Sequence, residues 1–195
     1  MKTLNELSLS ELWELFPINL KPYNPMYKRI YKQESSKIER LLSHLDVQRI
    51  SHIGSTAIEG IESKPIIDIL VELKDESKRD VIKKVLQNNK WILMKETLTP
   101  FNVSFNKGYT IDGYADSVFH LHLRKFGDCD AIYFRDYLNE HEDVRIRYEV
   151  LKKNLLKKYS KNRDAYTEGK TEFIHNVTKR AKQSYKYKYN LSHEK

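Results

Sequence analysis

Apolar residues along this chain follow two different spacings, and each spacing predicts a different secondary structure. Helical spacing begins after Pro25, a residue suited to a helix start. It returns in four later segments, which are predicted as helices: 78–89, 129–139, 142–159 and 164 to about 185. Alternating or β-branched runs fall between them and predict strands over 47–53, 65–73, 91–94, 101–105 and 117–123. Lys107 and Gly108 predict a turn after the fourth strand.

The order of these elements predicts an α+β fold. One helix precedes strands that surround a second helix, and the chain then continues in helices, so we expect helices packed on one side of a mixed β-sheet. The sequence contains no internal repeat and no linker rich in Gly or Ser. We therefore expect one domain over 1–195, made of an N-terminal extension (1–24), an α/β core (25–127), C-terminal helices (128–185) and a flexible tail (186–195).

The composition is typical of a packed domain outside the membrane. Hydrophobic residues make up 39% of the 195 residues, which is enough for a core. The run 65–70, apolar apart from Asp68, is far too short to span a bilayer, and acidic residues at positions 6, 11 and 14 argue against a signal peptide. Cys129 is the only cysteine, so no internal disulfide can form. We expect a cytoplasmic protein with no membrane partner.

The net charge of +8 is concentrated near the C-terminus. Residues 1–140 carry 20 basic and 20 acidic side chains, whereas residues 141–195 carry 15 and 7. This asymmetry suits the attraction of phosphates or nucleic acid, and Tyr and Lys alternate over 185–189 as they do in proteins that bind single strands. A solvated helix face and a solubilising tail explain the same features, so nucleic-acid binding is the less favoured alternative.

The most informative segment is a small polar loop followed by one carboxylate in an apolar strand. Gly54 and Ser55 offer backbone N–H groups and a hydroxyl, and the missing Cβ of Gly54 allows close approach of a phosphate. Asp68 lies within the strand 65–73, where burial of an unpartnered carboxylate is costly. Asp68 therefore needs a metal ion, a basic side chain or donor N–H groups.

These segments resemble the signature of the nucleotidyltransferase superfamily, whose fold is related to that of DNA polymerase beta. The closer resemblance is to the GrpB-like family within that superfamily. Five segments carry it, in this order: 52–56 (HIGST), 64–71 (KPIIDILV), 119–123 (FHLHL), 134–138 (FRDYL) and 165–170 (AYTEGK). The resemblance spans roughly residues 15–181 and implies a nucleotidyltransferase-like mixed sheet with flanking helices and a C-terminal helical segment.

The resemblance implies a metal and phosphate site, with one departure from the superfamily pattern. Superfamily enzymes use two acidic residues, two positions apart, to hold a divalent metal on a triphosphate. Asp68 matches the first of these, but position 70 is Leu. Glu72 shares the strand face of Asp68 and is a further metal-ligand candidate, about 13 Å along the strand at roughly 3.3 Å per residue. This departure argues against a conventional two-metal transfer.

Two histidines offer another way to complete the metal site. His120 and His122 point to one face of the strand 117–123. If that strand lies beside Asp68, the three side chains form a mononuclear site, and they are also the candidate catalytic residues. The expected cofactor is a divalent metal, Mg²⁺, Mn²⁺ or a transition metal, and two imidazoles favour the last. The alternative leaves one histidine in solvent and the other in a hydrogen bond.

The remaining candidates would contact a phosphate or the organic group attached to it. They are Thr56 in the loop, Lys64 before the strand, Arg135 on a predicted helix, and Tyr166 and Lys170, which share a helix face. Lys64 is equally well explained as an exposed loop lysine. Arg135 is equally well explained by a salt bridge, and Tyr166 by packing.

Three functions remain open. The favoured one is a nucleotidyltransferase-like protein that binds a nucleotide or a phosphorylated small molecule, with metal-dependent nucleotidyl transfer if catalysis survives the change at position 70. The second is a non-catalytic phosphate-binding module, which the resemblance links to coenzyme A metabolism because GrpB-like domains occur fused to dephospho-coenzyme A kinase. The third is a nucleic-acid-binding protein that uses the basic C-terminal helices. No feature of the sequence indicates an oligomeric state.

Overall fold

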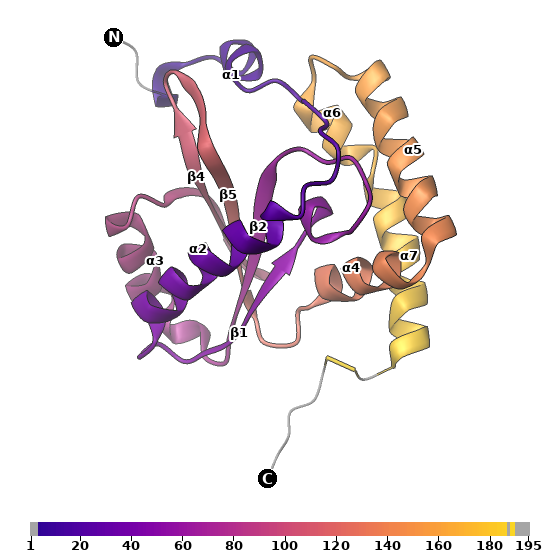
Figure 1. Cartoon of the computed structure of the whole chain (residues 1–195). Coiled ribbons are helices and arrows are strands. Elements are labelled where there is room, and N and C mark those ends of the chain that lie inside the picture. The colour runs from indigo at the N-terminus through magenta and orange to yellow at the C-terminus, as the bar shows by residue number, and fades with distance from the viewer. Residues whose placement is uncertain (1–3, 187, 190–195) are drawn as a thin grey trace.

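From residue 25 to α5, helices and strands follow one another in the order that the sequence predicted, whereas α1 was not predicted. Figure 1 shows the computed structural model, which describes residues 4–186 and 188–189. The helices are α1 (Leu9–Leu15), α2 (Met26–Leu42), α3 (Arg79–Asn88), α4 (Asp130–Glu140), α5 (Glu142–Lys158), α6 (Arg163–Glu168) and α7 (Thr171–Tyr185). The strands are β1 (Val47–Ile53), β2 (Ile66–Leu73), β3 (Ile92–Leu98), β4 (Phe101–Thr110) and β5 (Gly113–Lys125).

The strands form one mixed sheet in the order β1-β2-β5-β4-β3. β2 and β5 run parallel, and the other neighbouring pairs are antiparallel. Every residue of β2 is buried except Asp68, which is half-buried, as expected of a strand covered on both faces. The parallel pairing sets Asp68 beside His120 and Leu70 beside His122.

Helices α2 and α3 cover one face of the sheet (Figure 1). Alternate residues of β2 point to this face, so Ile67, Ile69 and Val71 join its core. Trp91 lies in the same core and is 2% exposed. The helices contribute Tyr27, Ile38 and Leu42 from α2 and Ile82 and Leu86 from α3.

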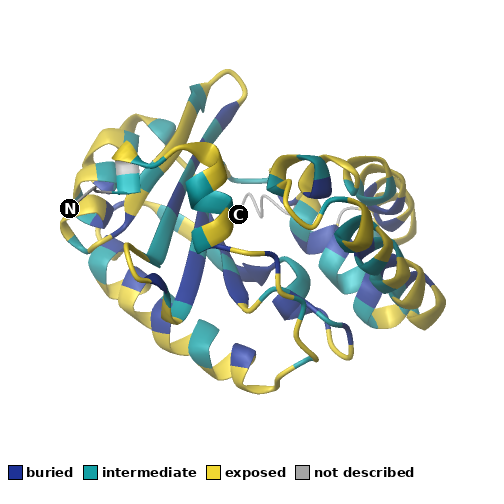
Figure 2. Cartoon of the chain, turned by 90° about the horizontal axis from the view of Figure 1, so that it is seen from above, coloured by how far each residue is buried: buried dark blue, intermediate teal, exposed yellow. Residues whose placement is uncertain are grey.

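The opposite face of the sheet is covered by α4 and α7. Leu70 of β2 and Ile53 of β1 pack there against Tyr133 of α4 and Ala181 of α7. The expectation of helices on one side only is therefore wrong, because β2 is buried on both faces and both faces are covered by helices. Figure 2 shows the result, with burial concentrated on the strands and on the inward sides of the helices.

The hairpin of β4 and β5 is longer than predicted, and Gly108 is not in a turn. The strand continues to Thr110, and the pairing register shifts between Lys107 and Tyr109. Gly108 has φ +90°, and a Cβ there would lie 2.3 Å from the carbonyl oxygen of Ser117. Glycine at this position therefore indicates a β-bulge with close backbone approach rather than a chain reversal.

The predicted helix 164–185 is divided into α6 and α7. Gly169 ends α6, and its N–H donates to the carbonyl of Ala165 at 3.0 Å. A Cβ on Gly169 would lie 2.4 Å from a methyl group of Leu155, so glycine lets α6 pack closely on α5. The break places Lys170 just before α7 instead of inside a helix.

Part of the predicted flexible tail packs against the fold. The ring of Tyr189 lies 4.8 Å from that of Tyr133, and Lys188 lies 4.5 Å from the ring of Tyr185. Residues 187 and 190–195 of the predicted tail lie outside the described residues. Among the described residues, no helix combines the length and the apolar character that a bilayer crossing requires.

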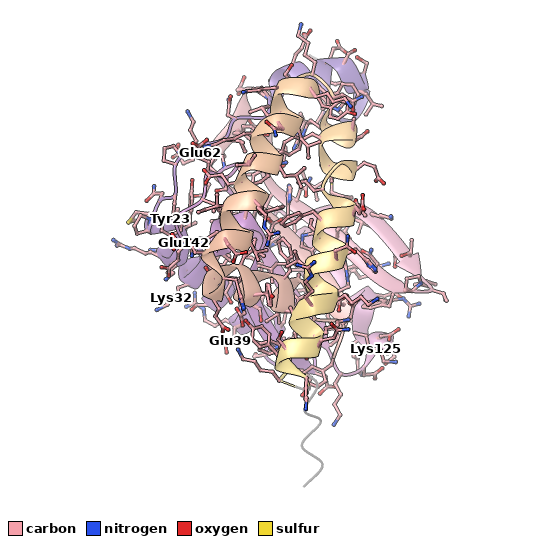
Figure 3. All side chains as sticks on the ribbon, turned by 90° about the vertical axis from the view of Figure 1, so that its right-hand side faces the viewer. Tyr23, Lys32, Glu39, Glu62, Lys125 and Glu142 are labelled. Atoms are coloured by element: carbon pink, nitrogen blue, oxygen red, sulfur yellow. The ribbon has the colours of Figure 1, made fainter. Side chains whose placement is uncertain are left out.

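The surface of α5 and α7 carries both signs of charge, as Figure 3 shows. On α5, Arg147 pairs with Asp143 at 2.9 Å and Lys153 with Glu149 at 3.1 Å. Lys182 of α7 pairs with an acidic residue of α4. Acidic partners therefore offset part of the basic excess, which does not favour a nucleic-acid interface on these helices.

Candidate functional site

Asp68 of β2 and two histidines of β5 form a polar cluster on the α4/α7 face of the sheet. His120 Nδ1 lies 3.2 Å from Asp68 Oδ1, and His122 Nε2 lies 3.4 Å from the same oxygen. The side chains are 24%, 22% and 28% exposed, in the order Asp68, His120, His122. The parallel register brings these groups together, because it sets the residues of β2 and β5 side by side.

Asp68 is held in its ionised form. Burial by itself would raise the pKa of this carboxyl group, but hydrogen bonds from His120 and His122 hold the pKa well below its usual range. An ionised carboxylate only accepts hydrogen bonds, so His120 Nδ1 donates to Asp68. On the other side of the ring, His120 Nε2 lies 2.7 Å from the hydroxyl of Tyr109, whose ring stacks on His120 at 5.9 Å.

The position of the Asp68 carboxylate requires glycine at position 54. The φ of Gly54 is +70°, and a Cβ built on it would lie 2.2 Å from Asp68 Oδ2. The backbone therefore lies directly against the carboxylate, and any side chain at position 54 would displace it. Next to Gly54, Ser55 is half-buried and hydrogen-bonds the hydroxyl of Tyr148, whose pKa burial raises to about 12. The loop of Gly54 and Ser55 thus borders the Asp68 cluster.

Thr56 has a structural contact instead of an open position. Its side chain is 1% exposed, and its hydroxyl donates to the carbonyl of Ile66 at 3.0 Å. His52 Nε2 lies 3.0 Å from the same hydroxyl and must be the donor, because the hydroxyl proton is already used. Burial lowers the pKa of His52 to about 4, so this histidine is neutral at pH 7. The prediction that Thr56 contacts a phosphate does not fit this arrangement.

Lys64, Lys152, Arg163 and Lys170 are electrostatically coupled to one another, and we call them the cation group; Lys64 and Lys170 are also coupled to Asp68. Two of them lie over the buried ring of Tyr166, with the Nζ of Lys170 at 4.7 Å from the ring centre and that of Lys64 at 5.7 Å. Three of the candidates named from the sequence, Lys64, Tyr166 and Lys170, therefore lie together. Tyr166 itself is 1% exposed and serves as packing between the two lysines.

The cation group is held at an electrostatic cost. Burial lowers the pKa of Lys64 to about 7, and the positive charges of Lys170 and Arg163 add to this effect. Burial also lowers the pKa of Lys152 to about 7 and lowers that of Lys170. Asp68 offsets part of this cost for Lys64 and Lys170, and a bound anion would stabilise the group further.

A cavity of about 370 Å³ opens beside the cluster. Its lining includes His120 and Tyr109 from the sheet, together with Lys64 and Arg163 from the cation group. A ligand in this cavity would therefore contact a member of the Asp68 cluster and two cations at the same time.

Glu72 and Arg135 are committed elsewhere. Glu72 is fully buried and accepts hydrogen bonds from Arg49 Nε at 2.5 Å and Arg49 Nη2 at 2.9 Å. Arg135 donates to the carbonyl of His52 and to Asp136, each at 2.6 Å. The structure does not bring Glu72 into the metal cluster. Arg135 binds the backbone of β1 and forms a salt bridge with Asp136, which is the alternative considered for it. We leave both out of the proposed site.

Tyr109, Lys152 and Arg163 were not singled out from the sequence. Tyr109 was missed because the predicted strand ended at residue 105, so its pairing with β5 was not anticipated. Lys152 and Arg163 lie on α5 and α6, and no local motif marks them. Only the packing of these helices beside the sheet reveals their role.

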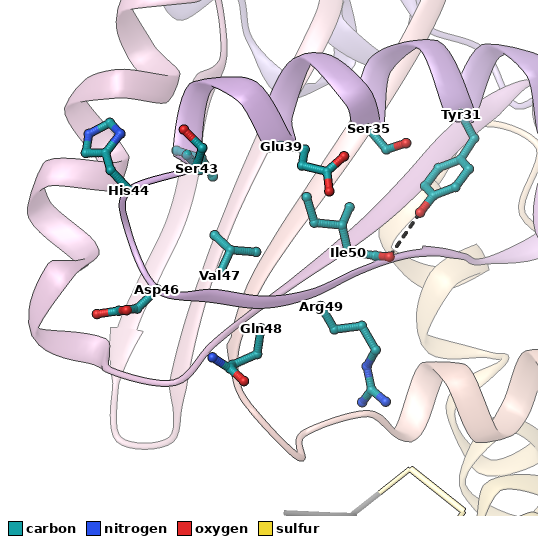
Figure 4. Close-up of a pocket in the computed structure, with 11 residues that line it drawn as sticks. Tyr31, Ser35, Glu39, Ser43, His44, Asp46, Val47, Gln48, Arg49 and Ile50 are labelled. Carbon is teal, nitrogen blue, oxygen red and sulfur yellow. Dashed lines mark hydrogen bonds between the residues drawn. The ribbon is translucent and has the colours of Figure 1, made fainter.

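Another cavity, of about 710 Å³, lies between α2 and β1 (Figure 4). Tyr31 crosses one end of it and donates to the carbonyl of Ile50 at 3.1 Å. Its lining includes Glu39, His44 and Asp46 but no member of the Asp68 cluster or of the cation group. It offers no comparable combination of metal ligands and cations, so the chemistry is assigned to the smaller cavity.

The donor set of the Asp68 cluster fits a divalent metal. One carboxylate oxygen and two imidazole nitrogens lie within 4.8 Å of one another. Such a mixed O/N set suits a transition metal such as Zn²⁺ or Mn²⁺ better than Mg²⁺, which prefers oxygen ligands. Asp68, His120 and His122 are thus the described residues that could hold a cation.

Comparisons with known proteins place these features in a family. The family model described as "GrpB protein" matches residues 17–180. The glutamate-rich protein GrpB of Alkalihalophilus pseudofirmus is 36% identical over 157 residues, which cover 77% of this chain and 88% of that protein. The crystal structure of the conserved protein GrpB from Enterococcus faecalis matches with a TM-score of 0.74 at 25% identity, covering 86% of this chain and 99% of the other.

A more distant structure shares the fold alone. The GLD-2/RNP-8 complex matches with a TM-score of 0.52 at 13% identity, covering 89% of this chain and 69% of the other. The fold is α+β, with a mixed sheet and flanking helices. The segment matched by the family model contains the Asp68 cluster and the cation group, whereas α1 precedes it. By its sequence over residues 17–180 and by its fold, this chain belongs to the GrpB protein family.

Proposed function

We propose that this protein binds a nucleotide or another phosphorylated small molecule beside a divalent metal held by Asp68, His120 and His122. The observation that carries the proposal is the cation group next to the metal-ligand cluster. Lys64 and Lys170 are costly to hold close together, and a bound phosphate would offset that cost. The nucleotidyltransferase-like fold of the family is consistent with such a ligand.

A divalent cation at the cluster would neutralise negative charge on the phosphate. The ligand nitrogens of His120 and His122 must be unprotonated to hold it, so we expect metal affinity to fall as the pH falls. Lys64 and Arg163 would orient the phosphate from the cavity side, and Gly54 keeps the carboxylate of Asp68 in place.

A second candidate function is binding without catalysis. Leu70 takes the place of the second acidic ligand, and Glu72 is fully occupied by Arg49. Among the described residues, Asp68 is the one carboxylate of the metal-ligand cluster, which does not favour the two-metal transfer used by the superfamily. Nucleotidyl transfer to a hydroxyl or phosphate acceptor is the catalytic form of the proposal.

Calorimetric titration with ATP or UTP in the presence of Mn²⁺ tests the binding site. We expect heat of binding with the unchanged protein and a loss of the metal-dependent part in Asp68→Asn. Lys64→Met and Lys170→Met should each weaken nucleotide binding by about tenfold, the value of one charge-assisted contact. Lys32→Met, an exposed lysine on α2, is the matched control and should leave binding unchanged. Absence of binding by both nucleotides with Mn²⁺, Mg²⁺ and Zn²⁺ would contradict the proposal.

Turnover separates the two forms of the proposal. Release of pyrophosphate from a nucleoside triphosphate, abolished by Asp68→Asn, would support nucleotidyl transfer. Binding that depends on Asp68 without release of pyrophosphate or phosphate would support the non-catalytic module.

A further inference from the structure

The cavity beside the Asp68 cluster has an apolar wall that a phosphate alone would not need. Leu9, Leu12, Trp13 and Phe16 form it on the side of α1, and Ile92 and Met94 form it on the side of β3. Figure 1 shows α1 lying over the end of the sheet near α6, away from α2 and α3. The cavity is thus charged on one side and apolar on the other.

We propose that this wall, which we call the α1 wall, binds an aromatic ring attached to the phosphate, as in a nucleotide. The inference rests on the proposed function and specifies its ligand as an aromatic phosphate ester. Lys64 and Arg163 line the same cavity, so one molecule can place its phosphate on the cations and its ring on the wall.

The exposure of the wall is typical of a binding site. Leu9 is 64% exposed, Met94 57% and Ile92 42%, although all three line one cavity. Large apolar side chains that gather at one opening mark a binding site more often than scattered ones do. Their neighbour Phe16 is 3% exposed, so it anchors this segment of the wall.

The chemistry of the lining favours a ring over an acyl chain. The rings of Phe16 and Tyr109 lie 4.9 Å apart in an edge-to-face contact, and those of Phe16 and Tyr114 lie 5.1 Å apart. Trp13 lines the same space. Phe16 is buried in these contacts, so Trp13 is the side chain of the wall that can stack on a flat ring. Asn106, Asp164 and Thr167 also line the cavity and offer donors and acceptors that a heterocycle can use and a hydrocarbon chain cannot.

The geometry links the wall to the metal-ligand cluster. Tyr109 contacts Phe16 through its ring and His120 through its hydroxyl, at 2.7 Å. A cavity of about 370 Å³ is within the range of small-molecule sites. The α1 segment is fixed locally, because Ser8 and Glu11 form a capping box at its start.

The test compares adenosine 5′-monophosphate with ribose 5-phosphate and octyl phosphate by calorimetry, at one Mn²⁺ concentration. We expect the nucleotide to bind about tenfold more tightly than ribose 5-phosphate, the usual size of one base-stacking contact. Trp13→Ala should remove most of this difference and leave ribose 5-phosphate unaffected, whereas Trp13→Phe should retain it. Val150→Ala, an exposed apolar residue on α5, is the matched control and should change neither affinity.

The outcomes distinguish this inference from the function on which it rests. Equal binding of the nucleotide and ribose 5-phosphate, unaffected by Trp13→Ala, would overturn the ring site alone. Tighter binding of octyl phosphate than of the nucleotide would also overturn it, because the wall would then serve an alkyl chain. Binding of none of the three would overturn the proposed function as well. Circular dichroism of the variants at position 13 shows whether they remain folded.

Discussion

The contact between Gly54 and Asp68 explains a residue that the sequence had marked for another reason. Glycine was expected to let a phosphate approach the backbone, but the group that occupies the missing side-chain space is the Asp68 carboxylate. Gly54 also has φ +70° and ψ −174°, a region that residues with a Cβ rarely adopt. Conformation and close contact therefore both require glycine here.

A residue with a Cβ in this backbone conformation costs about 1–3 kcal/mol. We expect Gly54→Ala to lower the free energy of unfolding by more than this amount. The added Cβ would also push Asp68 away from His120 and weaken metal binding. Gly60→Ala is the matched control, because Gly60 has φ +75° but nothing within 4 Å of a Cβ. Urea unfolding and Mn²⁺ titration of both variants measure the two effects. Equal loss of stability in the two variants, with normal metal binding, would contradict this account.

At this scale the sequence predicted the partners of Asp68 but not the occupation of Glu72. His120 and His122 share a face by simple alternation, so one assumption, that their strand lies beside Asp68, completed the cluster. Glu72 satisfies the same alternation. Its partner Arg49 comes from the neighbouring strand, and no sequence spacing predicts which side chain reaches across.

Among the elements, β1 is an edge strand whose backbone is partly covered by side chains. Tyr31 of α2 donates to the carbonyl of Ile50, and Arg135 of α4 donates to the carbonyl of His52. Arg49 of β1 reaches back to the buried Glu72 of β2. These contacts occupy acceptors at the edge and tie β1 to the sheet, which lowers the risk of pairing with another chain.

Arg49→Met should destabilise the protein by about 3–5 kcal/mol, because Glu72 would remain buried without its charged partner. Glu72 is 0% exposed, and the Cζ of Arg49 also lies 5.4 Å from the ring centre of Phe126, so charge and packing are both lost. Arg147→Met breaks the exposed pair with Asp143 and should cost less than about 1 kcal/mol. Chemical denaturation of both variants gives the comparison, and similar small losses would show that the buried pair contributes little.

Element boundaries were predicted closely wherever local pattern decides them. The predicted strand 47–53 coincides with β1, and the predicted helix 142–159 differs from α5 by one residue. The strands β3 and β5 are longer than predicted, α1 was not predicted, and two further failures are at glycines. Gly108 allows a bulge within β4, and Gly169 ends a helix, and both functions depend on a neighbour that is distant in sequence. A glycine alone does not distinguish a turn from a close approach.

For the whole molecule, the C-terminal helices and the sheet share their packing. Ile58 and Ile61, from the segment after β1, pack with Phe134 and Leu138 of α4 and with Val177 of α7. The cation group itself comes from α5, α6 and the segments before β2 and α7. The proposed site therefore needs both parts of the chain.

Leu138→Ala should lower the free energy of unfolding by about 2–5 kcal/mol, since Leu138 is fully buried in the helical part. If the chain is one cooperative unit, Trp91 on the other face of the sheet should report the same shift as circular dichroism. A Trp13→Phe background leaves Trp91 as the sole tryptophan for this measurement. Val150→Ala should shift neither signal by much. Loss of helical signal with unchanged Trp91 fluorescence would indicate two separate units.

The overall class was predictable, but its layering was not. Element order predicted an α+β fold with a mixed sheet, and the five family-like segments predicted its type. Helices lie on both faces because consecutive apolar residues of β2 are buried on opposite sides: Ile69 points to one face and Leu70 to the other. The apolar run of β2 is visible in the sequence, but it does not reveal which helix covers which face.

The position of α1 has an evolutionary consequence. The residues of α1 come before position 17, where the family match begins, whereas the Asp68 cluster and the cation group lie inside the matched segment. Exposed wall residues such as Leu9 can therefore be replaced without a change in the segment that the family model matches, whereas Phe16 packs on Tyr109 of the sheet. Under the proposed ring site, relatives that differ in this N-terminal segment would differ in the organic group that they accept.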